Sequence, residues 1–364
     1  MNVSFFASRT ISWYMARVFV VRSAAVLAAL VLVLMALDLL GESGDILAYK
    51  GNGDAQLWYY TSLRLPQLVQ RFLPFSVLLG TLITLATMNQ NSEIISMKAA
   101  GISAHQILAP LVAASLAIAG LSFWFNDHVV ARATAVLTAW QNVDYGPIPK
   151  AHGVTSNVWV RAGEDLVHAD RVVSRGGHVT LQGVSYYDRT GDRLIAIANA
   201  PRADYQGGAW VLQNVHRFDV AAGKMATIPS ATIGQGVTPD RFTLANIDAD
   251  GMSFRGLAEA ISALRAAGRP TAGLETVLWH KFSGPLSAVL MPLLAGVAGF
   301  GLARSGVLFI RAVIGMALGF TYFVADNFAL AMGNIGAYPP LLAAWSPFLL
   351  FLLIGEAVLI RTEE

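Results

Sequence analysis

Residues 71–127 read RFLPFSVLLGTLITLATMNQNSEIISMKAAGISAHQILAPLVAASLAIAGLSFWFND. The interval between Arg71 and Glu93 contains no charged residue, and neither does the interval between Lys98 and Asp127. A helix needs about 20 apolar residues to cross the hydrocarbon core of a bilayer. Both intervals are long enough, so the stretch predicts two membrane-spanning helices joined by a short polar segment.

The same criterion predicts six membrane-spanning segments in the whole chain. They cover about residues 14–40, 66–89, 104–126, 279–303, 312–333 and 341–360. The composition agrees, because 55% of the 364 residues are hydrophobic and 13% are charged, whereas soluble domains have about 25% charged residues. A net charge of +2 argues against a nucleic-acid binder that relies on bulk positive charge, and the lack of cysteine excludes disulfides and thiolate sites.

Residues 127–272 differ from these segments, because they are polar, interrupted by glycines and patterned like β-strands. Strand-like stretches occur at 157–161, 178–182, 194–197 and 210–212. Short strands separated by glycine turns favour a sandwich, a barrel or a jellyroll. The predicted fold class is therefore a polytopic α-helical membrane protein with six transmembrane helices and an inserted all-β, jellyroll-like domain.

Basic residues predict the orientation. Arg9, Arg17 and Arg22 lie at the N-terminal side of the first segment, and Lys and Arg concentrate in cytoplasmic regions. Both termini and residues 90–103 are expected in the cytoplasm, and the β domain outside it. The predicted domains are residues 1–126 with three membrane helices and a cytoplasmic helix at about 92–100, residues 127–272 with the β domain and a return helix, and residues 273–364 with three more membrane helices.

The cytoplasmic segment predicts a short amphipathic helix. Asn91 or Ser92 would cap it, Glu93 lies in its first turn, and Gly101 would end it. Such a helix can lie in a groove of a cytosolic partner. It can equally be an interfacial helix in which Glu93 only complements the helix dipole, and the spacing leaves both interpretations open.

Motifs for catalysis are absent from the sequence, which has no phosphate-binding loop, no paired-histidine metal spacing and no nucleophile elbow. We therefore expect a non-catalytic chain without a cofactor or metal of its own. Asp326 lies inside the fifth segment, and an acid in the membrane indicates a functional site by default. The alternative is a structural hydrogen bond to Tyr322, to Asn327 or to a neighbouring helix.

Basic residues at the outer ends of the segments are candidate contacts for an anionic lipid. Arg64 and Arg71 precede or open the second segment, Arg132 follows the third, and His280 and Lys281 open the fourth. Each can pair with a phosphate or extend to bulk lipid headgroups.

The chain resembles the LptF/LptG family of lipopolysaccharide-export permeases over nearly its full length, and it resembles the LptG branch more closely. The resemblance rests on residues 92–101 (SEIISMKAAG), 73–74 (LP), 253–257 (SFRGL), 279–281 (WHK), 285–286 (PL), 301–305 (GLARS) and Asp326. It implies that the helix at 92–100 is the family's coupling helix, in which Glu93, Ile94, Met97 and Lys98 contact an ATPase.

The resemblance also implies a set of partners in the bacterial inner membrane. These are an LptF-like permease as heterodimer partner, an LptB-like ATPase dimer that carries ATP and Mg, and an LptC-like single-helix protein that receives the lipid at a periplasmic jellyroll. One departure concerns the outer end of the first helix, where the family has lysines. Residues 35–42 here contain two acids, Asp38 and Glu42, and no base, which makes Arg71 and Arg132 the better candidates for lipid phosphates.

Three other functions stay open on the sequence. One is the sister LptF-like subunit of the same transporter. A second is a proton-coupled secondary transporter that uses Asp326. The third is a structural protein that anchors a β domain at the membrane without transport.

Overall fold

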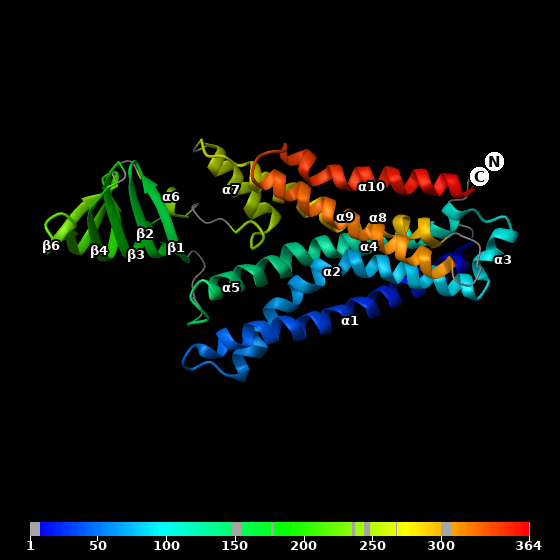
Figure 1. The fold of residues 1–364 in the computed structure, drawn as a ribbon. Coiled ribbons are helices and arrows are strands. Elements are labelled where there is room, and N and C mark those ends of the chain that lie inside the picture. The colour runs from blue at the N-terminus through cyan, green and yellow to red at the C-terminus, as the bar shows by residue number, and fades with distance from the viewer. Residues whose placement is uncertain are drawn as a thin grey trace. The chain divides into compact units, whose positions relative to one another are not determined.

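The structure is a computed structural model that describes residues 8–147, 154–175, 178–191, 193–234, 237–243, 248–266, 268–299 and 307–363. The chain forms two compact units (Figure 1). The helical unit comprises Met1–Gly44, Gly53–Ala135 and Ala249–Glu364, and the β unit comprises Asp45–Asn52 and Val136–Asp248.

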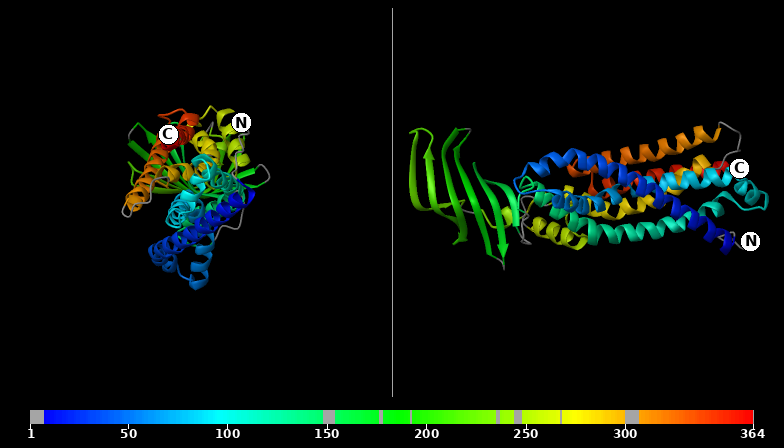
Figure 2. Two further views of the ribbon diagram at one scale, coloured as in Figure 1. Left: turned by 90° about the vertical axis from the view of Figure 1, so that its right-hand side faces the viewer. Right: turned by 90° about the horizontal axis from the view of Figure 1, so that it is seen from below.

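Eight helices belong wholly or mostly to the described part of the helical unit. They are α1 (Arg9–Ala48), α2 (Asp54–Gln90), α3 (Glu93–Ala99), α4 (Ala104–Phe125), α7 (Phe254–Ala266), α8 (Ala272–Gly299), α9 (Val307–Asn334) and α10 (Pro340–Glu363). Figures 1 and 2 show the long helices running alongside one another. The described start of α1, the end of α10 and the short helix α3 lie at one end of this unit (Figure 1).

Five helices of the described residues are long and apolar enough to cross a membrane. They cover Arg9–Ala48, Asp54–Gln90, Ala104–Gln141, Val313–Asn334 and Pro340–Ile360. The prediction of a polytopic helical protein is therefore confirmed. The predicted segment 279–303 falls on α8, whose described part ends at Gly299, and α8 is not among the five.

The third predicted helix does not end at residue 126. It continues through a π-helical turn, Asn126–Val130, into α5 (Ala131–Gln141). Residues 131–141 contain no glycine or proline and are rich in alanine, so nothing in them stops a helix. The π-helical turn accommodates one extra residue in the helix. The structure thus divides the chain differently from the predicted boundary at residue 127.

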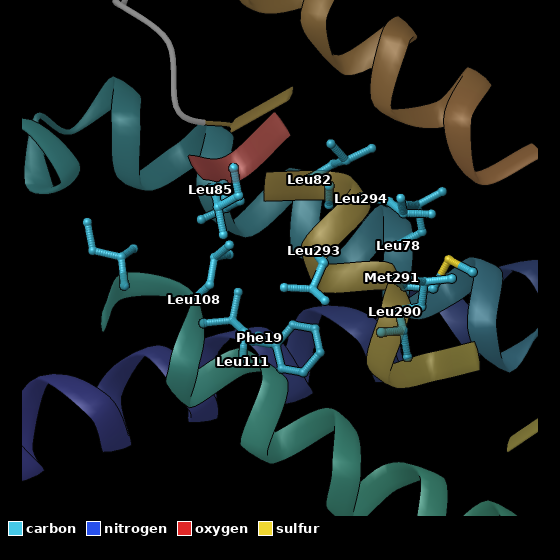
Figure 3. Packing of buried hydrophobic residues seen from close by; sticks show 14 of the residues in the cluster. Phe19, Leu78, Leu82, Leu85, Leu108, Leu111, Leu290, Met291, Leu293 and Leu294 are labelled. Carbon is cyan, nitrogen blue, oxygen red and sulfur yellow. The ribbon is translucent and has the colours of Figure 1, made fainter. Parts of the chain in front are cut away.

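The core of the helical unit is built by α1, α2, α3, α4, α8, α9 and α10. Figure 3 shows Phe19, Leu78, Leu108 and Leu294 among the side chains packed together there. The central helix is α8, which packs against α2, α4, α9 and α10. Helix α2 approaches α1 closely at Gly80, where an added Cβ would lie 2.2 Å from the Ser23 hydroxyl oxygen.

This core also contains hydroxyl side chains. Thr81, Thr84 and Ser115 are fully buried, and each donates to the backbone carbonyl four residues earlier, at 2.7 to 2.8 Å. Such bonds satisfy a polar side chain inside its own helix. They allow polar residues in an apolar bundle without a partner on another helix.

The β unit contains one sheet of six antiparallel strands, followed by α6 (Asp240–Thr243). The strands are β1 (Val154–Ala162), β2 (Asp165–Arg175), β3 (His178–Thr190), β4 (Arg193–Gln206), β5 (Ala209–Asp219) and β6 (Lys224–Ile233). One face carries the core, where Trp210 is fully buried against Phe242 and its indole N–H donates to the Val237 carbonyl at 2.8 Å.

The predicted strand stretches lie within β1, β3, β4 and β5, so the all-β region is confirmed. The strand order differs from a jellyroll, because the strands pair in chain order as a meander and a jellyroll uses Greek-key connections. Short turns explain the meander. Gly207 and Gly208, with φ of 58° and 86°, reverse the chain directly between β4 and β5, so neighbouring strands are consecutive.

Candidate lipid cavity and coupling helix

A cavity of about 500 Å³ lies inside the helical unit, between α2, the α4–α5 helix, α8 and α9. Its polar wall residues include Gln67, Gln70, Arg71, Ser122, Asn126, His280, Lys281, Asp326 and Asn327. About 28 Å of helix separates Arg71 from the end of α2 beside α3, at 1.5 Å per residue. The cavity therefore lies roughly one membrane thickness away from α3.

Three residues that the sequence analysis selected on separate segments meet in this cavity, namely Arg71, Lys281 and Asp326. Lys281 is 6% exposed and Asp326 is 8% exposed. Burying charged groups is costly unless opposite charges or hydrogen bonds compensate. The described wall also includes Asp250, so two basic and two acidic side chains line the cavity. Such a wall can hold a polar headgroup whose anionic groups pair with Arg71 and Lys281.

Asp326 lies close to a neighbouring helix. The Oδ2 atom of Asp326 is 3.9 Å from Nε2 of His280 on α8, and the other ring nitrogen of His280 is 3.2 Å from the Ser283 hydroxyl. Asn327, which the sequence offered as a partner, donates instead to the Phe323 carbonyl at 2.7 Å. No sequence pattern pairs α8 with α9, so the proximity of His280 and Asp326 was not predictable.

Arg64, also a predicted lipid contact, is engaged within the chain. Its guanidinium donates to Asp38 on α1 at 2.8 Å and to Gln67 at 2.7 Å. The Tyr60 hydroxyl donates to the same Asp38 carboxylate at 2.6 Å. The Asp38 carboxylate is thus neutralised by Arg64 of α2, and Arg64 is not among the described cavity residues.

Arg132 lies on the exposed face of α5, and the described walls of the cavity do not include it. Thr134, two residues further on, lines the cavity and accepts from Gln67 at 3.1 Å. Residues two apart on a helix point in different directions. Arg71 and Arg132 therefore do not face the same space.

The predicted coupling helix forms as α3, and Gly101 ends it with φ of 82°. Ser92 is its N-cap, but in the left-handed conformation and without a side-chain cap bond. Ile94 and Met97 are buried in the core of the helical unit, because residues three apart share one face of a helix. Their contact with a partner stays a prediction, and within this chain both side chains face the bundle.

The outward side of α3 carries other residues. Ile95 is 49% exposed, and Lys98 is exposed. Glu93 is partly buried, and its carboxylate accepts a long hydrogen bond of 3.4 Å from the Tyr14 hydroxyl. The exposed surface of α3 therefore includes Ile95, Ser96 and Lys98, with the partly buried Glu93 beside them.

A bundle of apolar helices around a polar cavity, with an amphipathic helix at one end and an attached β unit, defines a multi-pass membrane protein of the permease class. The family described as "Lipopolysaccharide export system permease LptF/LptG" matches residues 13–361, and the chain belongs to this family. It is therefore a permease of lipopolysaccharide export and a membrane subunit rather than an enzyme.

Two relatives are similar over most of the chain. Identity is 27% over 309 residues to the lipopolysaccharide export system permease protein LptG of Escherichia coli (strain K12), which covers 83% of this chain and 84% of that protein. Identity is 26% over 326 residues to the protein of the same name from Haemophilus influenzae, with 86% and 89% covered.

Proposed function

We propose that the chain is the LptG-like permease subunit that extracts lipopolysaccharide from the inner membrane and passes it to a periplasmic bridge. Its partners would be an LptF-like permease, an LptB-like ATPase dimer that binds ATP and Mg, and an LptC-like single-helix protein. The names of the relatives favour the LptG-like over the LptF-like alternative. This chain itself would hold no cofactor.

The observation that carries the proposal is the separation of two features within one helical unit. The cavity with Arg71 and Lys281 lies far along α2 from α3. A lipid with anionic headgroup phosphates would occupy the outer half of the bundle, where a guanidinium and an ammonium can pair with it. Force from a cytosolic ATPase would enter at α3 and reach the cavity through α2 and α4.

Six crossings are part of the proposal, with α8 as the fourth. Helix α8 has 28 residues, about 42 Å at 1.5 Å per residue, and the polar residues near its start line the cavity. An even number of crossings returns both termini to one side, and the described start of α1 and end of α10 do lie at one end of the helical unit in Figure 1. The β unit, inserted between the third and fourth crossings, would then lie in the periplasm.

For Asp326 we propose a structural role between α8 and α9 rather than a proton site. Its carboxylate faces His280 across the two helices at 3.9 Å. The family match supports a permease of lipopolysaccharide export, and the contacts described for Asp326 do not favour the alternative of a secondary transporter.

The proposal is tested by capture of the tagged chain from native membranes, with the co-purified proteins and lipids identified by mass spectrometry. We expect a second permease, an ATPase, a single-helix protein and lipopolysaccharide. Capture of lipopolysaccharide without an ATPase would contradict the coupling proposal, and capture of neither would contradict the proposed function as a whole.

A further inference from the structure

The face of the β sheet opposite its core carries a continuous row of side chains, one from each strand, which we call the polar row. Direct cross-strand pairing joins its members in the order Trp159, His168, Ser185, Asn199, His216 and Thr227. Side chains alternate between the two faces along a strand. The neighbours of the row, such as Val158, Val167 and Val215, are buried in the core, so the row lies on the other face.

One end of the polar row is aromatic. The Trp159 ring is centred 4.4 Å from the His168 ring and is stacked on Tyr187 with 5.6 Å between the ring centres. Trp159 is nevertheless 50% exposed. The other two rings contact the indole, and about half of its surface remains accessible to a ligand.

The middle of the polar row borders a shallow hollow of about 230 Å³, lined by Asp170, Gly183, Ser185, Asn199 and His216 among other residues. Gly183 has φ of 61°, and an added Cβ there would lie 1.9 Å from a carboxylate oxygen of Asp170. A side chain at this position would displace Asp170. The glycine therefore keeps the hollow open and the carboxylate, which is 69% exposed, at its edge.

The chemistry of this face fits a sugar ring. The row contains an amide, two hydroxyls and two imidazoles, which donate and accept hydrogen bonds without a fixed charge. A pyranose presents a C–H face that packs on an aromatic ring, whose face is electron-rich, and a rim of hydroxyls that hydrogen-bond. A phosphate would instead require a guanidinium or ammonium group, and the row has neither.

The size of the hollow supports the same assignment. Pockets for drug-sized ligands have volumes of about 300–1,000 Å³, so this hollow admits one or two rings rather than a whole lipid. We infer that this face of the β unit binds pyranose rings of the saccharide part of lipopolysaccharide. Trp159 on β1 stacks on one ring, and Ser185, Asn199 and His216 at the hollow bond the hydroxyls of another ring of the same saccharide. The choice of saccharide rests on the proposed function.

The test uses the full chain in detergent and, as probe, a core oligosaccharide from which acyl chains and phosphates have been removed. Isothermal titration calorimetry should show binding by the wild type. Trp159→Ala should weaken it about tenfold, the scale of a lost stacking contact, and Asn199→Ala should weaken it as well. Trp159→Phe should restore most of the affinity. Met225→Ala should leave it unchanged, because Met225, although 70% exposed on the same face, lies on β6 outside the described lining of the hollow.

Several results would overturn the inference. The inference is wrong if the wild type does not bind the oligosaccharide, or if Trp159→Ala and Asn199→Ala both bind it with unchanged affinity. It is also wrong if inorganic phosphate displaces the oligosaccharide. Loss of a co-purified protein by Trp159→Ala with oligosaccharide binding intact would show a protein interface instead. None of these results contradicts the proposed function. The proposed function is contradicted by a different result, in which the tagged chain captures neither an ATPase nor lipopolysaccharide.

Discussion

The helical unit and the β unit both bury an apolar core, but they differ in the polar side chains that they bury and in the apolar side chains that they expose. All buried polar or charged residues among the described part of the chain lie in the helical unit. The same unit exposes large apolar residues, and Leu32, Leu40 and Leu353 are each more than two-thirds exposed. The β unit has an apolar core of mainly valine, alanine and leucine, closed by Trp210 and Phe242.

The difference shows that the two units are adapted to different solvents. In water, apolar side chains are buried and unpaired polar groups are exposed. In lipid, apolar side chains can face outward, and polar groups are satisfied inside the protein. The hydroxyls of the helical core, which bond to their own helices, and the cavity with Lys281 and Asp326 follow the second rule. Substitutions in each unit can test this difference between the two units.

The largest expected effect is on the β core. Trp210→Ala should destabilise the β unit by about 3–5 kcal/mol, because it removes a fully buried indole and leaves a cavity. Hydrogen exchange of the intact chain should show lost protection in β1–β6 and unchanged protection in α2 and α8. Trp159→Ala, on the exposed face, is the matched control. Equal loss of protection in both variants would contradict the assignment of the core face.

A smaller effect is expected at α3. Glu93→Ala should reduce recovery of the ATPase and lipid release, because a charge contact in a protein interface is worth about 2–5 kcal/mol when desolvated and less at a rim. Ser96→Ala is the control, since its hydroxyl is exposed and bonds only to the Ser92 carbonyl among the described contacts. If Glu93→Ala recovers as much ATPase as the wild-type chain does, Glu93 does not contact the ATPase and only complements the dipole of α3.

The cavity predicts a modest difference between two arginines. Arg71 lines the cavity and Arg132 lies on an exposed face, so Arg71→Glu should reduce photo-crosslinking of lipopolysaccharide more than Arg132→Glu does. We expect a reduction of roughly fivefold for Arg71→Glu, because a partly solvated ion pair is worth about 1 kcal/mol. Expression levels serve as the control. Crosslinks at position 71 to phospholipid only would assign Arg71 to bulk lipid headgroups.

The smallest effect concerns pH. The Arg202 guanidinium donates to Asp204 at 2.9 Å and holds the pKa of that carboxyl below its ordinary value. A lowered pKa adds stability above the ordinary pKa, and this stability is lost as the pH falls through the lowered value. Arg202→Ala should therefore shift acid unfolding of the β unit slightly to higher pH, as followed by circular dichroism. A shift to lower pH would contradict this sign.

Much of the helical fold was predictable, because an uncharged run of about 20 apolar residues has the length and composition of a membrane-spanning helix. The ends of the helices were less predictable. Helix α2 begins at Asp54 rather than at residue 66, because the polar residues of its first turns extend a helix beyond the apolar run. The strands followed from alternation and glycine turns, but their order did not, because pairing depends on contacts that no local pattern records.

The candidate site was predictable only in part. Charge and position selected Arg71, Lys281 and Asp326, and the structure brings them to one cavity. The pairing of Arg64 with Asp38 depends on how α1 and α2 pack, and local sequence does not fix helix packing. For α3, residues three apart predict a shared face, but only the structure shows that Ile94 and Met97 turn this face inward.

The central claim is that the helical unit lies in lipid while α3 and the β unit face water on opposite sides of the membrane. The chain has no cysteine, so Thr190→Cys in the β unit and Ser96→Cys in α3 each provide a single site for a membrane-impermeant thiol reagent. In spheroplasts with an intact inner membrane, we predict labelling of Thr190→Cys, and labelling of Ser96→Cys only after permeabilisation. Labelling of Thr190→Cys only from the cytoplasmic side would contradict the account.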